Sequence, residues 1–248
     1  MRIGIDIGST AAKAAALEGD EIACTVVVPT GFNGVDAALR LADALREHGI
    51  DVGACDAHVV ATGYGRVSVP YAGKTVTEIT CHGRGAAFLF GPDGTVIDVG
   101  GQDTKVIQLA DGKVRKFVMN DKCAAGTGKF LEVIADRMGV TQEELATLAA
   151  AGSPTQISSM CTVFAESEVI SLIGKGEARE NIANGVIESV VSKVSSLAVG
   201  LLQGDAFLTG GLCENDYVVE RLAHHLSCPV VTNRNARYAG AIGAALSA

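Results

Sequence analysis

Two segments of the chain place an aspartate, a glycine and a lysine at the same spacing. Asp6 is followed by a glycine two residues later and by Lys13 seven residues later, and Asp98 is followed in the same way by Gly100 and Lys105. Glycine turns let backbone N–H groups approach phosphate oxygens, and a nearby aspartate can bind Mg²⁺ or its water ligands. The pattern indicates a nucleotide-phosphate site with a divalent cation.

A third glycine turn, Gly210-Gly211, follows a predicted strand over 205–209 and is expected near the nucleoside. The chain has no G-x-x-x-x-G-K-[ST] segment, and none of its glycines gives a G-x-G-x-x-G that follows a strand and opens a helix. The three turns therefore predict a nucleotide site that is neither a P-loop nor a Rossmann site.

The elements that must position these turns also repeat. Predicted strands over 3–7, 11–17 and 22–28 contain the first motif, and strands over 95–99, 104–109 and 114–119 contain the second. We interpret this as a duplicated strand–turn–strand unit in an α/β protein. We expect a first lobe over 1–93 that includes a closing helix at 235–248, and a second lobe over 94–234.

Cys123 and Cys161 each precede a predicted helix, over 124–138 and 162–173. A helix N-terminus stabilises a thiolate, so these two are candidates for metal or redox chemistry. A 4Fe–4S cluster needs four thiolates, which a two-fold dimer would supply, although the spacing alone does not require it. The other five cysteines are interpreted as small buried hydrophobic side chains: Cys24, Cys55, Cys81, Cys213 and Cys228.

The segments Asp6–Lys13, Asp98–Lys105 and Phe207–Gly211 resemble the phosphate and adenosine motifs of the actin/hexokinase/acetate-kinase ATPases, which have a ribonuclease H-like fold. The resemblance implies two lobes with ATP in the cleft between them, and Mg²⁺ served by Asp6 and Asp98. Either Gln102 or Asp103 would position the attacking water, and the choice stays open. The implied nucleotide-binding residues are Gly8, Ser9, Thr10, Lys13, Gly100, Gly101, Gly126, Gly210 and Gly211.

Longer segments resemble the activator components of 2-hydroxyacyl-CoA dehydratases, ATPases of the BadF/BadG/BcrA/BcrD type. These segments are Asn120–Gly128, Ser158–Ser171, Ala61–Arg66 and Glu78–His82. The resemblance implies a homodimer that shares one 4Fe–4S cluster through Cys123 and Cys161. It also implies ATP hydrolysis that drives one low-potential electron to a partner enzyme.

The resemblance leaves the partner open between a 2-hydroxyacyl-CoA dehydratase, a benzoyl-CoA reductase and a double-cubane-cluster reductase. It implies a ferredoxin or flavodoxin as the electron donor. Two other functions are considered: a small-molecule kinase, such as an amino-sugar kinase, with Asp103 as base, and a structural or chaperone-like ATPase. Such kinases are commonly longer than this chain, and neither function gives Cys123 and Cys161 a role.

Composition and the pattern of apolar residues bear on the partners and the cellular compartment of the protein. A net charge of −8 over 248 residues argues against nucleic acid as a partner, because phosphate backbones are bound by clustered Lys and Arg. No apolar run reaches the roughly 18 residues that span a bilayer, and the first residues read as a strand rather than a signal peptide. We expect a cytoplasmic protein without a membrane partner, and the exposed cluster that the resemblance implies at a dimer axis suggests an anaerobic cytoplasm.

Overall fold

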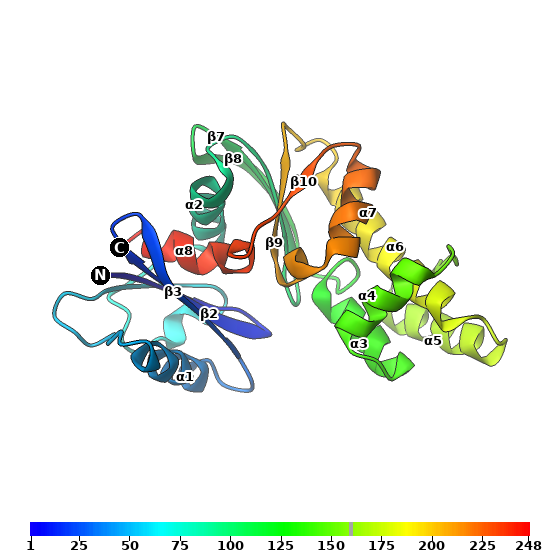
Figure 1. Cartoon of the computed structure of the whole chain (residues 1–248), viewed down its shortest axis with the longest axis horizontal. Helices are drawn as coiled ribbons and strands as arrows, with labels where there is room; N and C mark the ends of the chain where they lie inside the picture. Colours follow the sequence, from blue (N-terminus) through cyan, green and yellow to red (C-terminus); the bar gives the residue numbers. More distant parts are fainter. Residues whose placement is uncertain (159–160) are drawn as a thin grey trace. The chain divides into compact units, whose positions relative to one another are not determined.

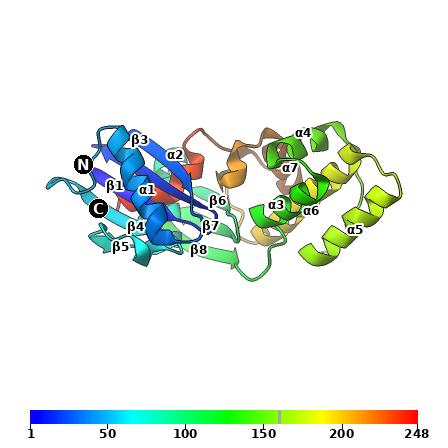
Figure 2. The ribbon, with the colours of Figure 1, turned by 90° about the horizontal axis from the view of Figure 1, so that it is seen from below.

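The computed structural model describes residues 1–158 and 161–248 (Figures 1 and 2). The chain forms two compact units. One comprises Met1–Val96, Ile107–Phe117 and Asn233–Ala248, and the other comprises Ile97–Val106 and Val118–Thr232. The residues 159 and 160 of the Ser158–Ser171 motif lie outside the described part of the chain.

The first sheet has the strand order β3-β2-β1-β4-β5. β1 pairs antiparallel with β2 and parallel with β4, so the sheet is mixed. The antiparallel register places Asp6 opposite Lys13, at the end of the pair next to the first glycine turn. The strands are β1 (Arg2–Ile7), β2 (Ala11–Glu18), β3 (Glu21–Pro29), β4 (His58–Thr62) and β5 (Lys74–Thr75).

The second sheet repeats this order. Followed from its β8 edge, the second sheet has the strand order β8-β7-β6-β9-β10. When its strands are counted from β6, this is the order third, second, first, fourth and fifth, as in the first sheet. This shared topology confirms the predicted duplication of the strand–turn–strand unit. The strands are β6 (Gly94–Val99), β7 (Thr104–Ala110), β8 (Lys113–Asn120), β9 (Ala206–Gly210) and β10 (Val230–Val231).

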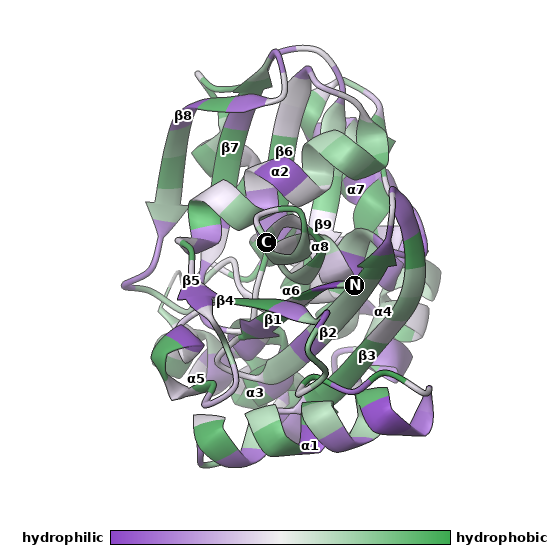
Figure 3. Ribbon diagram, turned by 90° about the vertical axis from the view of Figure 1, so that its left-hand side faces the viewer, coloured by the Kyte–Doolittle hydropathy of each residue, from purple (hydrophilic) through white to green (hydrophobic). Residues whose placement is uncertain are grey.

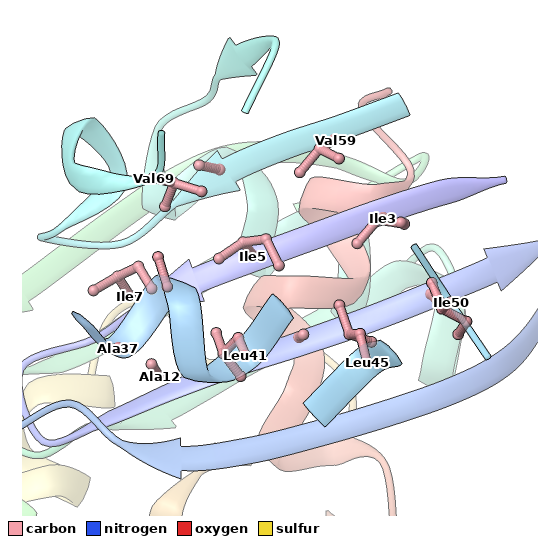
Figure 4. Packing of buried hydrophobic residues seen from close by; sticks show 14 residues of the cluster. Ile3, Ile5, Ile7, Ala12, Ala37, Leu41, Leu45, Ile50, Val59 and Val69 are labelled. Atoms are coloured by element: carbon pink, nitrogen blue, oxygen red, sulfur yellow. The ribbon is translucent and has the colours of Figure 1, made fainter. Parts of the chain in front are cut away.

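Helix α1 (Gly34–Glu47) covers one face of the first sheet. Its fully buried Leu41 and Leu45 pack with side chains of β1, including Ile5 (Figure 4). Hydrophobic and hydrophilic residues alternate along this helix (Figure 3), as in a helix with one buried face. Asn33 caps its start by accepting a hydrogen bond from the Val35 N–H at 2.9 Å.

Helices α2 (Glu78–Phe90) and α8 (Ala239–Ala245) pack on one another in the same unit. A Cβ on Gly243 would overlap the Cys81 carbonyl of α2, and a Cβ on Gly4 would overlap the Ala241 carbonyl of α8. Only glycine permits these approaches. They pack α8 against α2 and also against β1, the strand that carries Asp6.

The second unit contains five further α-helices within the described residues: α3 (Gly128–Met138), α4 (Gln142–Ala151), α5 (Thr162–Gly174), α6 (Arg179–Ala198) and α7 (Asp216–Leu226). Thr141 and Glu144 form a capping box at the start of α4. α6 ends at Ala198, because Val199 leaves helical geometry and Gly200 has a φ of +90°.

Candidate functional site

The first glycine turn connects β1 to β2 through Gly8, Ser9 and Thr10. Thr30 holds this turn from the side: its N–H donates to the Thr10 carbonyl at 2.9 Å, and its hydroxyl donates to the Gly8 carbonyl at 2.8 Å. Thr10 is exposed, and Gly8 and Ser9 are half-buried. The turn therefore presents backbone and hydroxyl groups from a fixed position, as a phosphate ligand requires.

Asp6 is buried at the foot of this turn, with an exposed fraction of 3%. Its Oδ1 has no hydrogen-bond partner among the residues that the structure describes. A buried carboxylate oxygen without a partner is costly, so it marks a place for a ligand. A carboxylate oxygen is a ligand that Mg²⁺ or its bound water prefers, and Asp6 therefore fits a magnesium site.

The second motif forms a buried ionic cluster. The Lys105 ammonium, with a side chain exposed by 1%, lies 2.8 Å from Asp103 Oδ1 and 3.5 Å from Asp98 Oδ2. The other oxygen of Asp98 accepts a hydrogen bond from the Thr209 hydroxyl at 2.9 Å, which ties the end of β6 to the end of β9. Asp98 is thus held rigidly by two partners from β7 and β9.

The two candidates for positioning water differ in environment. Asp103 is buried, with an exposed fraction of 4%, and its carboxylate is bound to Lys105. Its carbonyl accepts the N–H of Gly100 at 2.9 Å, which closes the turn. Gln102, one residue earlier, is exposed. Asp103 therefore serves the structure of the turn, and Gln102 is available to a ligand.

The third turn begins at Gly210, which ends β9 with a φ of +85°. A Cβ at this position would overlap the Val99 carbonyl and would lie 3.0 Å from Asp98 Oδ1. Gly211 opens the 3₁₀ helix η2 (Gly211–Glu214), and its own Cβ position is surrounded by open space. Gly210 allows β9 to end against β6, and Gly211 leaves room beside the turn.

Cys123 does not lie directly before a helix, so that prediction is wrong. α3 begins at Gly128, because residues 124–127 form a turn in which Gly126 has a φ of +82°. The Asn120 side-chain amide donates to the carbonyls of Cys123 and Ala125, both at 2.9 Å. The Cys123 loop is therefore held in a turn, with its thiol exposed.

The far end of the Cys123 loop is hydrogen-bonded to the second glycine turn. The N–H groups of Gly128 and Lys129, at the start of α3, donate to the carbonyls of Gly100 at 2.9 Å and Gly101 at 2.7 Å. The buried Thr104 hydroxyl donates to the Gly126 carbonyl at 2.6 Å. These three bonds give a direct physical connection between the Gly100–Gly101 turn and the segment that carries Cys123.

Cys161 lies at the N-cap of α5, as predicted. Its carbonyl accepts the Ala165 N–H at 2.8 Å, and its thiol is exposed. The first turn of α5 also exposes Val163 and Phe164, at 65% and 67%.

The remaining cysteines are divided by burial. Cys81 and Cys213 are buried and Cys24 packs against the core of the first sheet, which agrees with the interpretation as hydrophobic side chains. Cys55 is exposed, and for this residue the interpretation is wrong. Within the described residues no group of three or more His, Cys, Asp and Glu side chains could hold a metal ion.

We expect the thiols to react with iodoacetamide in two groups in apo protein at pH 8. Burial is the chief cause that raises the pKa of Cys81 to about 11, so at this pH about 0.1% of it is thiolate, against about a quarter for an ordinary thiol. Exposed Cys55, Cys123 and Cys161 should be modified first, as measured by peptide mass spectrometry. Modification of Cys81 at the rate of Cys55 in folded protein would contradict the structure.

None of the described helices combines the length and the apolar character that crossing a bilayer requires.

The whole chain is similar in structure to two dehydratase activators. It matches the crystal structure of (R)-2-hydroxyglutaryl-CoA dehydratase component A of Acidaminococcus fermentans with a TM-score of 0.93 and 43% identity, over 100% of this chain and 96% of that chain. It matches the activator of 2-hydroxyisocaproyl-CoA dehydratase from Clostridium difficile, with bound ADPNP, with a TM-score of 0.93 and 38% identity, over 100% and 93% of the two chains.

A more distant solved structure shares the fold of this chain. A ROK family glucokinase from Streptomyces griseus aligns with a TM-score of 0.61 and 16% identity, over 100% of this chain and 98% of that chain. Together with the two mixed sheets of equal strand order, this match shows the actin/hexokinase-like fold. The model of the BadF/BadG/BcrA/BcrD ATPase family matches residues 3–248, and the chain belongs to this family.

Proposed function

We propose that this protein is an ATPase that activates a partner enzyme by ATP-driven transfer of one low-potential electron from a 4Fe–4S cluster. The observation that carries the proposal is the hydrogen-bonded connection between the Gly100–Gly101 turn and the Cys123 segment. It links a nucleotide motif to a candidate cluster ligand through Gly126, Gly128 and Lys129. An ATPase whose nucleotide state alters a cluster needs such a connection.

Cys123 and Cys161 are the residues that would hold the cluster. Both thiols are exposed, and two per chain from a homodimer make the four thiolates that a 4Fe–4S cluster takes. When bound, the cluster supplies a one-electron carrier of low potential. The amides at the start of α5 can donate to cluster sulfides and thereby tune that potential.

ATP and Mg²⁺ would be bound by the glycine turns. Asp6 has an oxygen available to the cation, whereas Asp98 is oriented by Thr209 and Lys105. Asp98 would therefore act from a fixed position on the cation or its water. The phosphates and nucleoside would be bound by Gly8, Ser9, Thr10, Lys13, Gly100, Gly101, Gly126, Gly210 and Gly211.

Gln102 is the residue that we propose to position the attacking water. We expect Gln102→Ala to lower the kcat of ATP hydrolysis by roughly 10²-fold with little change in melting temperature. Asp103→Asn, the matched variant, should lower the melting temperature because it weakens the pair with buried Lys105. Steady-state release of phosphate and calorimetry measure the two effects. Unchanged hydrolysis in Gln102→Ala would exclude this role.

The partner is proposed from the relatives. The two activators that match over 96% and 93% of their length are named for different dehydratases, of 2-hydroxyglutaryl-CoA and 2-hydroxyisocaproyl-CoA. We propose a 2-hydroxyacyl-CoA dehydratase or a related double-cubane-cluster enzyme as the partner. It would receive one electron per cycle, and a reduced ferredoxin or flavodoxin would replace that electron. An oxygen-sensitive cluster suits an anaerobic cytoplasm.

The small-molecule kinase is the second candidate, because the fold is shared with a glucokinase. That reaction would use Asp103 as the base, but Asp103 is buried and paired with Lys105. An assay with glucose and N-acetylglucosamine separates the two functions. We expect ADP and free phosphate to form in equal amounts without sugar, in protein that contains iron. Formation of a sugar phosphate by iron-free protein would favour the kinase.

A further inference from the structure

His82 is a buried histidine to which the proposed function gives no role. It lies on the second turn of α2 with an exposed fraction of 3%, and its Nε2 is 3.8 Å from Oε1 of Glu78, one helical turn earlier. The close packing of Gly243 on Cys81 fixes this part of α2. The backbone that carries the imidazole is therefore fixed against α8.

Gly240, near the start of α8, lies between the side chains of His82 and Asp6. The point that a Gly240 Cβ would occupy is 2.5 Å from Asp6 Oδ2 and 2.9 Å from His82 Nε2. The two side chains thus face the same small space, which exists only because residue 240 has no side chain. Gly63 borders the other oxygen of Asp6, since its Cβ position is 2.5 Å from Oδ1.

The charge of Asp6 also acts on the α2 side of this space, where Cys81 precedes His82. The neighbouring thiol of Cys81 has a pKa raised to about 11, chiefly by burial and in addition by the charges of Asp6 and Glu78, while Thr62 and Arg84 act in the opposite direction. A deeply buried carboxylate needs a donor on the protein side if its other oxygen is to face a ligand. His82 Nε2 is the ring nitrogen on that side.

We propose that His82 is a positioning residue for the magnesium site: its Nε2–H holds Asp6 by Oδ2, so that the unpartnered Oδ1 is presented to Mg²⁺ or to its bound water. Glu78 stands behind the same nitrogen and favours the tautomer with the proton on Nε2. The proposal rests on the proposed ATP and Mg²⁺ site at Asp6, and it extends that site to α2.

The test is the Mg²⁺ dependence of nucleotide binding, measured with a fluorescent ATP analogue. We expect His82→Leu to raise the Mg²⁺ concentration for half-maximal binding by about 10-fold or more, as outer-shell substitutions do. Binding in EDTA and the iron content should stay as in the wild type. His82→Gln, which can place an amide N–H near the position of Nε2, should restore most of the Mg²⁺ response.

Two further variants, His58→Leu and Asp6→Asn, serve as controls. His58→Leu changes an exposed histidine of the same unit and should leave the Mg²⁺ response unchanged. Equal Mg²⁺ responses in His82→Leu and the wild type would overturn the role of His82, as would equal loss in His82→Leu and His82→Gln with unchanged melting temperatures. If Asp6→Asn also leaves the Mg²⁺ response unchanged, the proposed magnesium site itself is wrong.

Discussion

Replacing Cys123 or Cys161 by serine is expected to abolish binding of the proposed iron–sulfur cluster. Either change would leave a pair of chains with two thiolates instead of four, which is too few for a 4Fe–4S cluster. Both side chains are exposed, so serine at either position should not disturb the core. We expect the absorbance and iron content of anaerobically reconstituted protein to fall to background. ATP affinity should stay within about three-fold, because neither thiol belongs to a glycine turn.

Cys55→Ser is the matched control, since Cys55 is the exposed cysteine outside the two candidate positions among the described residues. It should keep the full iron content and nucleotide affinity. Retention of iron by Cys123→Ser and Cys161→Ser would remove these residues as ligands. Loss of ATP binding together with iron in a folded variant would show that the two sites are not separable.

Lys105→Ala is expected to lower the free energy of unfolding by about 3–5 kcal/mol. Removing one partner of a buried ionic cluster leaves the others charged and without compensation, and this penalty exceeds the loss of the contact itself. In the wild type the Lys105 side chain is only 1% exposed and pairs with the carboxylates of Asp98 and Asp103. Without it, these two carboxylates would stay buried with no cation beside them. Urea denaturation of the apo protein measures the change.

Lys13, the equivalent lysine of the first Asp–Gly–Lys motif, provides the control for Lys105→Ala. Lys13 occupies the same place in the first motif, but it is half-buried and forms no ion pair within the described part of the chain. Lys13→Ala should therefore change the free energy of unfolding by less than about 1 kcal/mol, while it weakens ATP binding. Equal destabilisation by the two substitutions would contradict the different roles assigned to the two lysines.

Local spacing predicted most of the elements. The Asp–Gly–Lys repeat indicated two equivalent strand–turn–strand units, and the two sheets have the same strand order. The turns are alike in detail: Cβ atoms on Gly8 and Gly100 would each approach the carbonyl three residues later, of Ala11 and Asp103. Such features depend on residues close in sequence, where turn chemistry and strand periodicity act.

The repeat did not predict that its two lysines have different environments. The first motif has Ala11 where the second has Asp103, so only Lys105 has two carboxylates to neutralise it. This difference also bears on the choice that the sequence left open, because a carboxylate committed to Lys105 is poorly suited to orient water. The burial of Asp103, which spacing does not reveal, is the observation that favours Gln102 in our proposal.

The structural features that the sequence did not predict depend on tertiary contacts. α3 begins four residues later than its periodicity indicated, because Gly126 adopts a positive φ and its carbonyl is bound by Thr104. The contact of His82 with the surroundings of Asp6 joins α2 to β1 across more than seventy residues of sequence. Neither helical nor strand periodicity contains information of this kind.

The shared cluster is tested most directly by iron and acid-labile sulfide measured on the anaerobically purified wild-type protein, together with its native mass. The account predicts about four irons and four sulfides per two chains, in a particle of twice the 25.4 kDa chain mass. A colourless, iron-free monomer that still binds ATP after anaerobic reconstitution would contradict it.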